Sequence, residues 1–284
     1  MKKTLIDLLS EVISPTELTG VYRSYDIVGD IAIIRLTDAS EKYAEKIADA
    51  VMSVHRNVKT VLAQKGAVSG EFRLRNLTHV AGENRTTTVH SESGCLFSVD
   101  VGECYFSPRL GYERARIAGL VQPGETVVNM FAGAGCFSIV LAKQVSNVKV
   151  YSIDVNHAAV QLMTENIRLN RLYGKIFPIL GDAKAVVEKQ LECRADRVLM
   201  PLPEKALQYL PCAASALRPR GGWIHVYVFE HATKTENPSM IATQKIKETL
   251  DGLGIKSEVP NARIMRSTGP NWWQIAADVH VAGR

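Results

Sequence analysis

Short apolar runs alternate with helix-like segments through the second half of the 284-residue chain, and this alternation restricts the fold more than any other feature of the sequence. Residues 126–130 and 148–153 predict two buried strands, and residues 136–144 between them predict a helix. A second helix is predicted at residues 158–170, and further strands at 175–180, 197–200 and 223–229. Because helical sequence separates consecutive strands, we expect a mostly parallel sheet that is covered on both faces.

The end of the chain departs from this rhythm. Residues 255–266 and 273–281 predict two strands, and only residues 267–272 lie between them. A link this short has no room for a crossover helix, so the two strands must be antiparallel. The sequence therefore predicts a parallel sheet that is completed by one antiparallel hairpin.

The first hundred residues predict a different arrangement, with short strands around a single helix. Strands are predicted at residues 21–28, 31–36, 58–62, 86–90 and 96–100, and a helix at residues 40–55. Hairpin turns are expected at Gly29-Asp30 and at Ser93-Gly94. We therefore divide the chain into a small α/β domain at residues 1–104 and a larger domain at residues 105–284.

The composition excludes several classes of protein. Hydrophobic residues make up 46% of the chain and charged residues 22%, as in ordinary globular proteins, and the net charge of +5 suits an acidic partner. The first residues, Met1 to Asp7, meet charge too early for a secretion signal, and no apolar run approaches the roughly 20 residues that span a bilayer. The five cysteines form no C-x-x-C pair, so we expect reduced thiols, no metal site and a cytoplasmic location.

Three consecutive strands of the larger domain end in residues suited to a nucleotide-like ligand. The first runs into the glycine loop 132–135, the second ends at Asp154, and the third ends at Gly181-Asp182. Ligands of open α/β sheets bind at the carboxyl ends of the strands, where an acid can accept hydrogen bonds from ribose hydroxyls. An NAD site is disfavoured because Ser138 stands where the third glycine of its fingerprint belongs.

A set of motifs identifies a family. They lie at residues 70–75, 79–86, 105–117, 130–139, 153–156, 165–170 and 222–227. In this order they resemble the motifs of the archaeal and eukaryotic tRNA (guanine37-N1)-methyltransferases, and the similarity runs from about Tyr25 to the C-terminus. The resemblance implies a class I (Rossmann-like) S-adenosylmethionine-dependent methyltransferase fold, of class α/β, with a small N-terminal α/β domain. The form that it implies lacks the N-terminal domain that grips the outer corner of tRNA, because only about 20 residues precede the small domain.

The resemblance also implies the chemistry and its residues. The methyl group of S-adenosyl-L-methionine would be transferred to N1 of guanosine 37 in tRNA, with Glu113 as the base that removes the N1 proton and Arg73 as the donor to O6. The matching cofactor positions are Tyr105, Arg114, Phe131, Gly133, Asp154, Val155, Asp182, Ala183 and Pro201. The matching tRNA positions are Arg109, Asn156 and Pro203. We expect tRNA as the partner, a monomer, and neither a metal nor a membrane.

Two positions depart from the family pattern. Asn129 stands where members usually have Asp, and Pro201 stands where many have an Asn whose side chain can bond the target base. Three alternatives stay open. The two departures motivate methyl transfer to a wyosine-type precursor and tRNA binding without catalysis, and the expected lack of the tRNA-grip domain motivates aminocarboxypropyl transfer to the same precursor, as in a sister family. The intact segment 107–110 and Glu113 argue against aminocarboxypropyl transfer.

Overall fold

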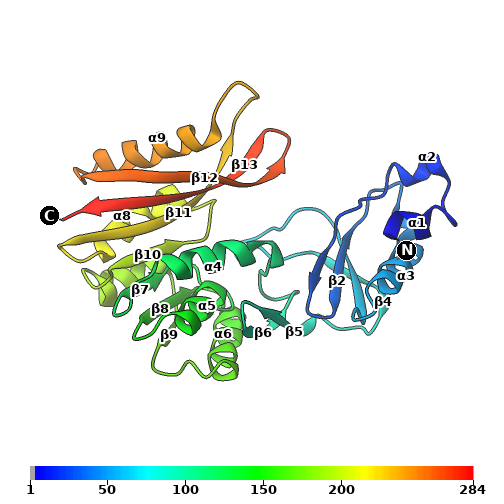
Figure 1. Cartoon of the computed structure of the whole chain (residues 1–284), viewed down its shortest axis with the longest axis horizontal. Coiled ribbons are helices and arrows are strands. Elements are labelled where there is room, and N and C mark those ends of the chain that lie inside the picture. The colour runs from blue at the N-terminus through cyan, green and yellow to red at the C-terminus, as the bar shows by residue number, and fades with distance from the viewer. Residues whose placement is uncertain (1–3, 284) are drawn as a thin grey trace. The chain divides into compact units, whose positions relative to one another are not determined.

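The computed structural model describes residues 4–283, so Met1, Lys2 and Lys3, on which part of the argument against a secretion signal rests, lie outside the described residues, as does Arg284. The chain forms two compact units that divide after Glu113 (Figure 1). This division falls inside helix α4 (Gly111–Leu120), whereas the sequence places the domain boundary before that helix, after residue 104. We call residues 4–113 the N-terminal unit and residues 114–283 the C-terminal unit.

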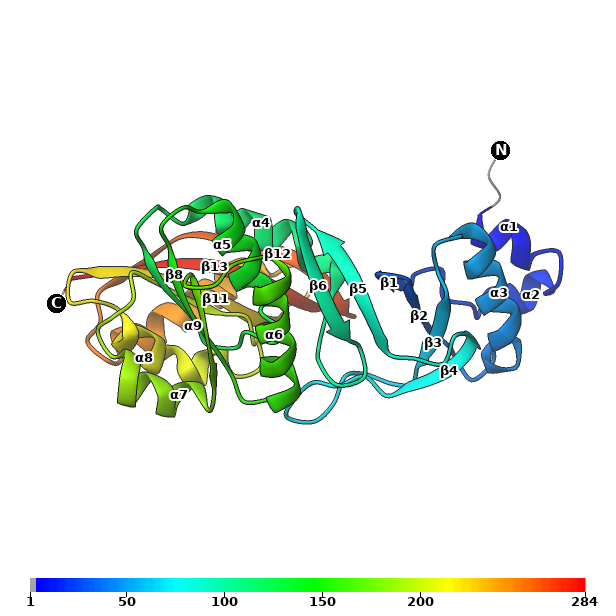
Figure 2. The same cartoon turned by 90° about the horizontal axis from the view of Figure 1, so that it is seen from below.

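The N-terminal unit is built on a four-stranded sheet in the order β1-β2-β3-β4 (Figure 2). Its strands are β1 (Asp26–Val28), β2 (Ile31–Arg35), β3 (Thr60–Gln64) and β4 (Leu77–Gly82). Strands β2 and β3 are parallel and are connected through a 3-10 turn (Glu41–Tyr43) and helix α3 (Ala44–Val54). Helices α1 (Leu5–Leu9) and α2 (Pro15–Leu18) precede the sheet, and the buried face of α3 packs with Leu5 and Leu9 in one core.

A separate two-stranded sheet completes this unit. It is an antiparallel hairpin of β5 (Thr87–Glu92) and β6 (Cys95–Asp100). Its two turn residues, Ser93 and Gly94, both have positive φ, which is the backbone of the favoured two-residue hairpin turn. The expected turn is therefore confirmed. A 3-10 turn (Pro108–Leu110) then leads into α4.

The C-terminal unit contains a seven-stranded sheet in the order β12-β13-β11-β10-β7-β8-β9. The strands are β7 (Thr126–Asn129), β8 (Lys149–Asp154), β9 (Ile176–Leu180), β10 (Arg197–Met200), β11 (Gly221–His231), β12 (Ser257–Gly269) and β13 (Trp272–Ala282). Strands β7 to β11 are parallel, whereas β13 pairs antiparallel with both β11 and β12. This arrangement confirms the predicted parallel sheet with a final antiparallel hairpin.

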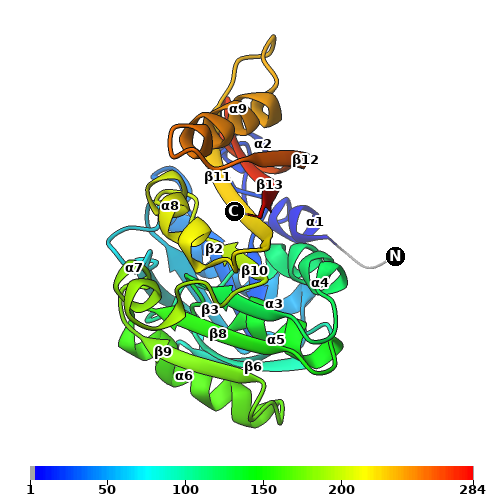
Figure 3. The same cartoon turned by 90° about the vertical axis from the view of Figure 1, so that its left-hand side faces the viewer.

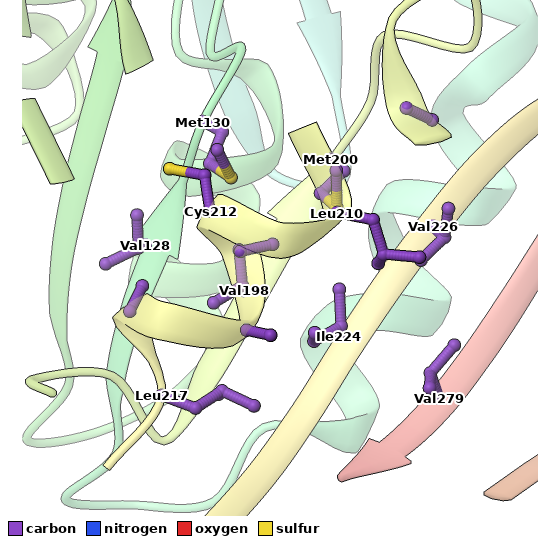
Figure 4. Packing of buried hydrophobic residues seen from close by; sticks show 14 of the residues in the cluster. Val128, Met130, Val198, Met200, Leu210, Cys212, Leu217, Ile224, Val226 and Val279 are labelled. Carbon is purple, nitrogen blue, oxygen red and sulfur yellow. The ribbon is translucent and has the colours of Figure 1, made fainter. Parts of the chain in front are cut away.

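Helices cover both faces of this sheet. They are α5 (Cys136–Gln144), α6 (His157–Leu169), α7 (Ala183–Val186) with a π-helical extension (Val187–Leu191), α8 (Ala206–Ala216) and α9 (Pro238–Asp251). Figure 3 shows α5 and α6 on the opposite side of the sheet from α7 and α8. One core lies between the sheet and α7, α8 and α9, where side chains such as Val198, Leu210 and Ile224 are fully buried (Figure 4). Within residues 4–283 no helix is long and apolar enough to cross a membrane.

The prediction was less accurate in the N-terminal unit. Residues 21–25 are not part of a strand, the α-helix begins at Ala44 rather than at residue 40, and β4 was not predicted. Strand β4 is exposed or half-buried along its whole length, so its sequence lacks the regular apolar alternation of a strand that covers a core. Helices α1 and α2 are too short to show a helical period.

Candidate functional site

The carboxyl ends of four neighbouring parallel strands form the candidate site of the C-terminal unit. Strand β7 lies between β10 and β8, and β9 follows β8. From β7 the chain continues to β8, which pairs with β7 on one side. Strand β10 pairs with β7 on the other side, so the order of strands along the chain reverses direction at β7. Open α/β sheets bind their ligands at such a reversal. The predicted residues lie at the carboxyl ends of these four strands or shortly after them: Phe131, Gly133, Asp154, Val155, Asp182, Ala183 and Pro201.

The glycine loop after β7 is held directly against the end of β8. The backbone N–H of Gly133 donates to Oδ2 of Asp154 at 2.6 Å. Gly135 precedes α5 with φ of 83°, and a Cβ atom there would lie 2.8 Å from Cγ of the fully buried Met163. Both the backbone conformation and the close packing therefore require glycine at position 135.

Asp154 is the acid at the end of β8. Its Oδ1 accepts a hydrogen bond from the N–H of Asn156 at 2.9 Å, while Oδ2 accepts from Gly133. Burial raises the pKa of Asp154 against the opposing effect of these backbone N–H groups. Each carboxylate oxygen carries a further lone pair, so the group can also accept hydrogen bonds from two adjacent hydroxyls of a ligand.

Asn156, expected to contact tRNA, is occupied by the fold. Its side-chain oxygen accepts from the N–H of Ala158 at 3.0 Å and caps α6, and the residue is only 8% exposed. The cap accounts for Asn at this position without a substrate.

Asp182 follows β9. The residue is exposed, and its side chain also accepts hydrogen bonds from within the fold. It caps α7 by accepting from the N–H of Ala185 at 3.1 Å, and its Oδ2 accepts from the hydroxyl of Tyr209 at 2.6 Å. Burial raises the pKa of Asp182, but the hydrogen bond from Tyr209, the backbone N–H groups at the start of α7 and the charge of Lys205 together outweigh burial, so the pKa is lowered. The ring of Tyr209 meets that of Phe131 edge to face at 5.2 Å, which ties the ends of β7 and β9 together through α8. Tyr209 was not predicted, because nothing in its sequence neighbourhood points to this contact.

Two apolar side chains are exposed beside these acids. Val155 is 44% exposed and Leu180 is 50% exposed, and they follow or end two adjacent strands in which Asp154 pairs with Leu180. Exposed apolar side chains next to hydrogen-bonding groups suit a flat heterocycle with polar edges.

A buried amide at the end of β7 contains an unsatisfied acceptor. Asn129 is fully buried and donates through Nδ2 to the hydroxyl of Ser138 at 3.1 Å. Its Oδ1 has no hydrogen-bond partner within residues 4–283. Buried polar atoms are normally paired, so this oxygen suits a donor group of a ligand, such as an amine. Position 129 therefore lacks the acid that the family usually has, but the side-chain oxygen of Asn129 still provides a hydrogen-bond acceptor.

The segment after β10 presents proline rather than a polar side chain. Pro201 is half-buried and Pro203 is buried, and the turn that follows is closed by the N–H of Lys205 donating to the carbonyl of Leu202. Pro201 offers only its backbone carbonyl to a ligand.

Glu113 and Arg114 are consecutive charged residues that are both buried. Glu113, in the first turn of α4, is 2% exposed, and Arg114 is 3% exposed. Burying a charged group costs several kcal/mol, by an order-of-magnitude estimate, unless the group is paired or hydrogen-bonded, so such residues concentrate at functional sites. The neighbouring arginines Arg109 and Arg116 form ion pairs with Asp26 and Asp278, respectively.

The N-terminal unit brings Arg73 and Tyr105 together. The guanidinium carbon of Arg73 lies 4.6 Å from the centre of the Tyr105 ring, a distance at which cation and ring attract each other. Arg73 ends a turn that begins at Gly70: its backbone N–H donates to the carbonyl of Gly70, and its φ is 55°. A positive φ at a residue other than glycine is uncommon and is concentrated at functional positions.

Two further arginines of this unit, Arg75 and Arg109, bind the carboxylate of Asp26. Arg109 donates from Nε to Asp26 at 2.6 Å with its side chain 46% exposed, so part of the guanidinium still faces solvent. Arg75 is buried and donates to Asp26 and to the carbonyl of Phe106. The guanidinium of Arg75 is therefore held inside the unit by an ion pair.

All five cysteines are free thiols, and four of them are buried. Within residues 4–283 no group of three or more His, Cys, Asp or Glu side chains is arranged to hold a metal ion.

Comparison with known proteins identifies relatives over the whole described chain. Residues 88–255 match the TRM5/TYW2 methyltransferase domain, and residues 5–86 match the TYW2 N-terminal domain. A tRNA (guanine(37)-N(1))-methyltransferase Trm5b from Pyrococcus abyssi is 40% identical over 91% of this chain and 75% of its own length. Its crystal structure has a TM-score of 0.84 and covers 95% of this chain and 79% of that one.

Two further relatives match this chain from end to end. A tRNA 4-demethylwyosine(37)-methyltransferase Taw21 from Saccharolobus solfataricus is 35% identical over 98% of both chains. The structure of TYW2 from Pyrococcus horikoshii in complex with MeSAdo is 26% identical, has a TM-score of 0.80, and covers 99% of this chain and 98% of that one. These matches confirm the Rossmann-like methyltransferase fold.

Proposed function

The chain belongs to the TRM5/TYW2 methyltransferase family, and from this premise we propose that it transfers the methyl group of S-adenosyl-L-methionine to N1 of guanosine 37 in tRNA. The observation that carries this proposal is the buried carboxylate of Glu113 at the start of α4, in a chain whose sheet ends in two acids and a glycine loop. The family's relatives with this named activity cover most of the chain.

The residues at the carboxyl edge fit the cofactor. Asp154 can accept hydrogen bonds from the ribose hydroxyls, and Val155 and Asp182 can contact the adenine ring and its amino group. Oδ1 of Asn129 can accept from the amine of the methionine portion, and Arg114 can pair with its carboxylate. When bound, S-adenosyl-L-methionine supplies an electrophilic methyl group. We assign Tyr105, Phe131, Gly133, Ala183 and Pro201 to the same binding function.

Two residues act on the guanine. N1 of guanine carries a proton at neutral pH, so the ring becomes a good nucleophile only when a base accepts that proton. Glu113 is that base. Negative charge then develops on O6, and the guanidinium of Arg73, oriented by the Tyr105 ring, stabilises it by donating a hydrogen bond.

We assign Arg109, Asn156 and Pro203 to tRNA binding. The exposed part of Arg109 is suited to a phosphate, and Pro203 to shaping the loop after β10. Asn156 contributes chiefly by capping α6. The base must leave its stack to react, which costs least in a loop. We propose that the protein acts as a cytoplasmic monomer, which its free thiols suit.

Methyl transfer to a tricyclic wyosine precursor at the same position is the second candidate. Two observations favour it: Pro201 in place of a hydrogen-bonding Asn, and the end-to-end match to the Taw21 relative. Rates on tRNA that carries guanosine and on tRNA that carries the precursor would rank the two substrates. If guanosine is the substrate, the rate on tRNA that carries guanosine is higher than the rate on tRNA that carries the precursor. The Pro201→Asn variant should show the same ranking.

Labelled cofactor tests the main proposal. Purified protein should label tRNA that has guanosine at position 37, and replacement of that guanosine by adenosine should abolish labelling. Label that persists after the replacement would reject the assigned position.

A further inference from the structure

A chain of charged and polar side chains, three of them buried and two half-buried, ends on helix α4. Asp278 in β13 accepts two hydrogen bonds from the guanidinium of Arg116 in α4, at 2.7 and 2.9 Å. It also accepts from Nδ1 of His225 in β11 at 2.6 Å and from Nδ2 of Asn261 at 2.7 Å. Asp278 is only 5% exposed, so a buried carboxylate is surrounded by four donated hydrogen bonds.

His225 continues this chain with a defined proton. Nη1 of Arg197 lies 2.7 Å from Nε2 of His225. A guanidinium only donates hydrogen bonds, so Nε2 must be the acceptor and Nδ1 must carry the proton that is donated to Asp278. The imidazole is therefore neutral, in agreement with the pKa of His225, which burial lowers.

Arg197 closes the chain at the other end of α4. It binds both carboxylate oxygens of Glu125 at 2.8 and 3.1 Å, and its Nη2 donates to the backbone carbonyl of Leu120 at 3.0 Å. Leu120 is the last residue of α4, where carbonyls lack partners within the helix and a positive charge is favourable. The buried charge chain, which we define as Glu125, Arg197, His225, Asp278 and Arg116, thus holds α4 at two points four residues apart.

Stability alone does not account for such an arrangement. Two buried ion pairs lose most of their attraction to desolvation, and apolar side chains of similar volume often stabilise a core equally well or better. The two-pronged contacts of the guanidinium groups instead fix the direction and the distance between each arginine and its carboxylate. The two acids and two arginines also balance in charge.

We propose that the buried charge chain is a positioning device that fixes the place and axial rotation of α4, and thereby the carboxylate of Glu113, which lies three residues before Arg116. The inference rests on the proposed function, in which Glu113 is the base. Arg116 and Asp278 touch neither substrate nor cofactor in this account and act only through α4. Misplacement of a catalytic group by about 1 Å can reduce a rate about a hundredfold.

Arg116→Lys tests the device, because lysine keeps the positive charge and loses the two-pronged geometry. Arg220→Lys is the matched control, since Arg220 also pairs with a carboxylate, that of Asp196, but its side chain is 74% exposed. We expect Arg116→Lys to reduce the single-turnover rate with saturating tRNA and cofactor by at least about tenfold. The dissociation constant of S-adenosyl-L-methionine should stay within about twofold of the wild type, and Arg220→Lys should leave both quantities unchanged.

Amide hydrogen exchange of residues 114–120 provides a readout that does not depend on activity. Exchange in α4 should accelerate in Arg116→Lys and not in Arg220→Lys. A wild-type rate in Arg116→Lys overturns the inference, and so does a rate loss matched by an equal loss of cofactor affinity, which would indicate a general structural role. If the wild-type protein transfers no methyl group, the proposed function is wrong. The positioning role is tested separately by hydrogen exchange: exchange in α4 that is the same in Arg116→Lys as in the wild type would overturn it.

Discussion

At the scale of single residues, the proposed chemistry depends on a few side chains. The sequence identified several of these residues but not the long-range partners of others. Glu113 and Asp154 were identified from motifs, and the burial of Glu113 and the hydrogen bonds of Asp154 suit the expected roles. The partners of Asp278 were not identified, because Arg116 and Asp278 are separated by 162 positions and no local pattern joins them. Long-range polar pairs of this kind exist only in the folded chain.

Glu113→Gln should remove the base while keeping the size of the side chain. General-base catalysis contributes roughly a hundredfold or more, so the single-turnover rate should fall by at least that factor. Cofactor affinity, measured by calorimetry, should change little because Gln fills the same space. Transfer at the wild-type rate would show that another group removes the proton.

The protein should be less stable in mild acid, because the unfolded chain binds a proton at His225 more readily than the folded protein does. Burial lowers the pKa of the folded-state imidazole below the value of 6.5 that the unfolded chain has, so the unfolded state binds the proton first. The free energy of unfolding should therefore fall as the pH drops below about 6.5, by up to about 1.4 kcal/mol per pH unit.

Comparison of the wild type with His225→Gln isolates this contribution. The Gln amide keeps one donor and one acceptor but does not titrate. Urea unfolding between pH 7.5 and pH 5 should show a shallower pH dependence in the variant. Equal slopes in both proteins would mean that His225 is not the group responsible.

At the scale of elements, the predictions were accurate where burial imposes a regular pattern. Helix α5 and strand β10 begin and end where the sequence predicts, because both are buried along most of their length. Strand β4 and the turn that holds Arg73 were not predicted. Exposure removes the apolar period of β4, and the positive φ of Arg73 leaves no mark in the sequence. The antiparallel β12–β13 pair followed from the short link alone.

The glycine loop allows a matched test of local packing. Gly135→Ala adds a Cβ 2.8 Å from Cγ of Met163 at a φ of 83°, whereas Gly124→Ala meets no atom within 4 Å at a similar φ of 89°. Both variants carry the strain of a left-handed alanine, about 1–2 kcal/mol. Only Gly135→Ala should lose further stability and weaken cofactor binding, as measured by thermal unfolding and calorimetry. Equal behaviour of the two variants would argue against close packing at position 135.

At the scale of the whole molecule, charge and family membership point to an RNA partner. The chain has a net charge of +5 and belongs to a family in which several relatives are named for tRNA modification. Binding to phosphates releases counterions, so affinity for tRNA should fall by more than about tenfold between 50 and 200 mM salt. Filter binding measures this, with calorimetry of S-adenosyl-L-methionine as the salt-insensitive control. An affinity for tRNA that does not respond to salt would contradict a phosphate-dominated interface.

Mass analysis of nucleosides tests the central claim most directly. tRNA incubated with the protein and S-adenosyl-L-methionine is digested, and the nucleoside from position 37 is compared with that from untreated tRNA. The account predicts a gain of one CH₂ unit on guanosine 37, in a product with the chromatographic behaviour of 1-methylguanosine. An unmodified guanosine 37 in tRNA that the protein binds, or a methyl group at another position, would contradict it.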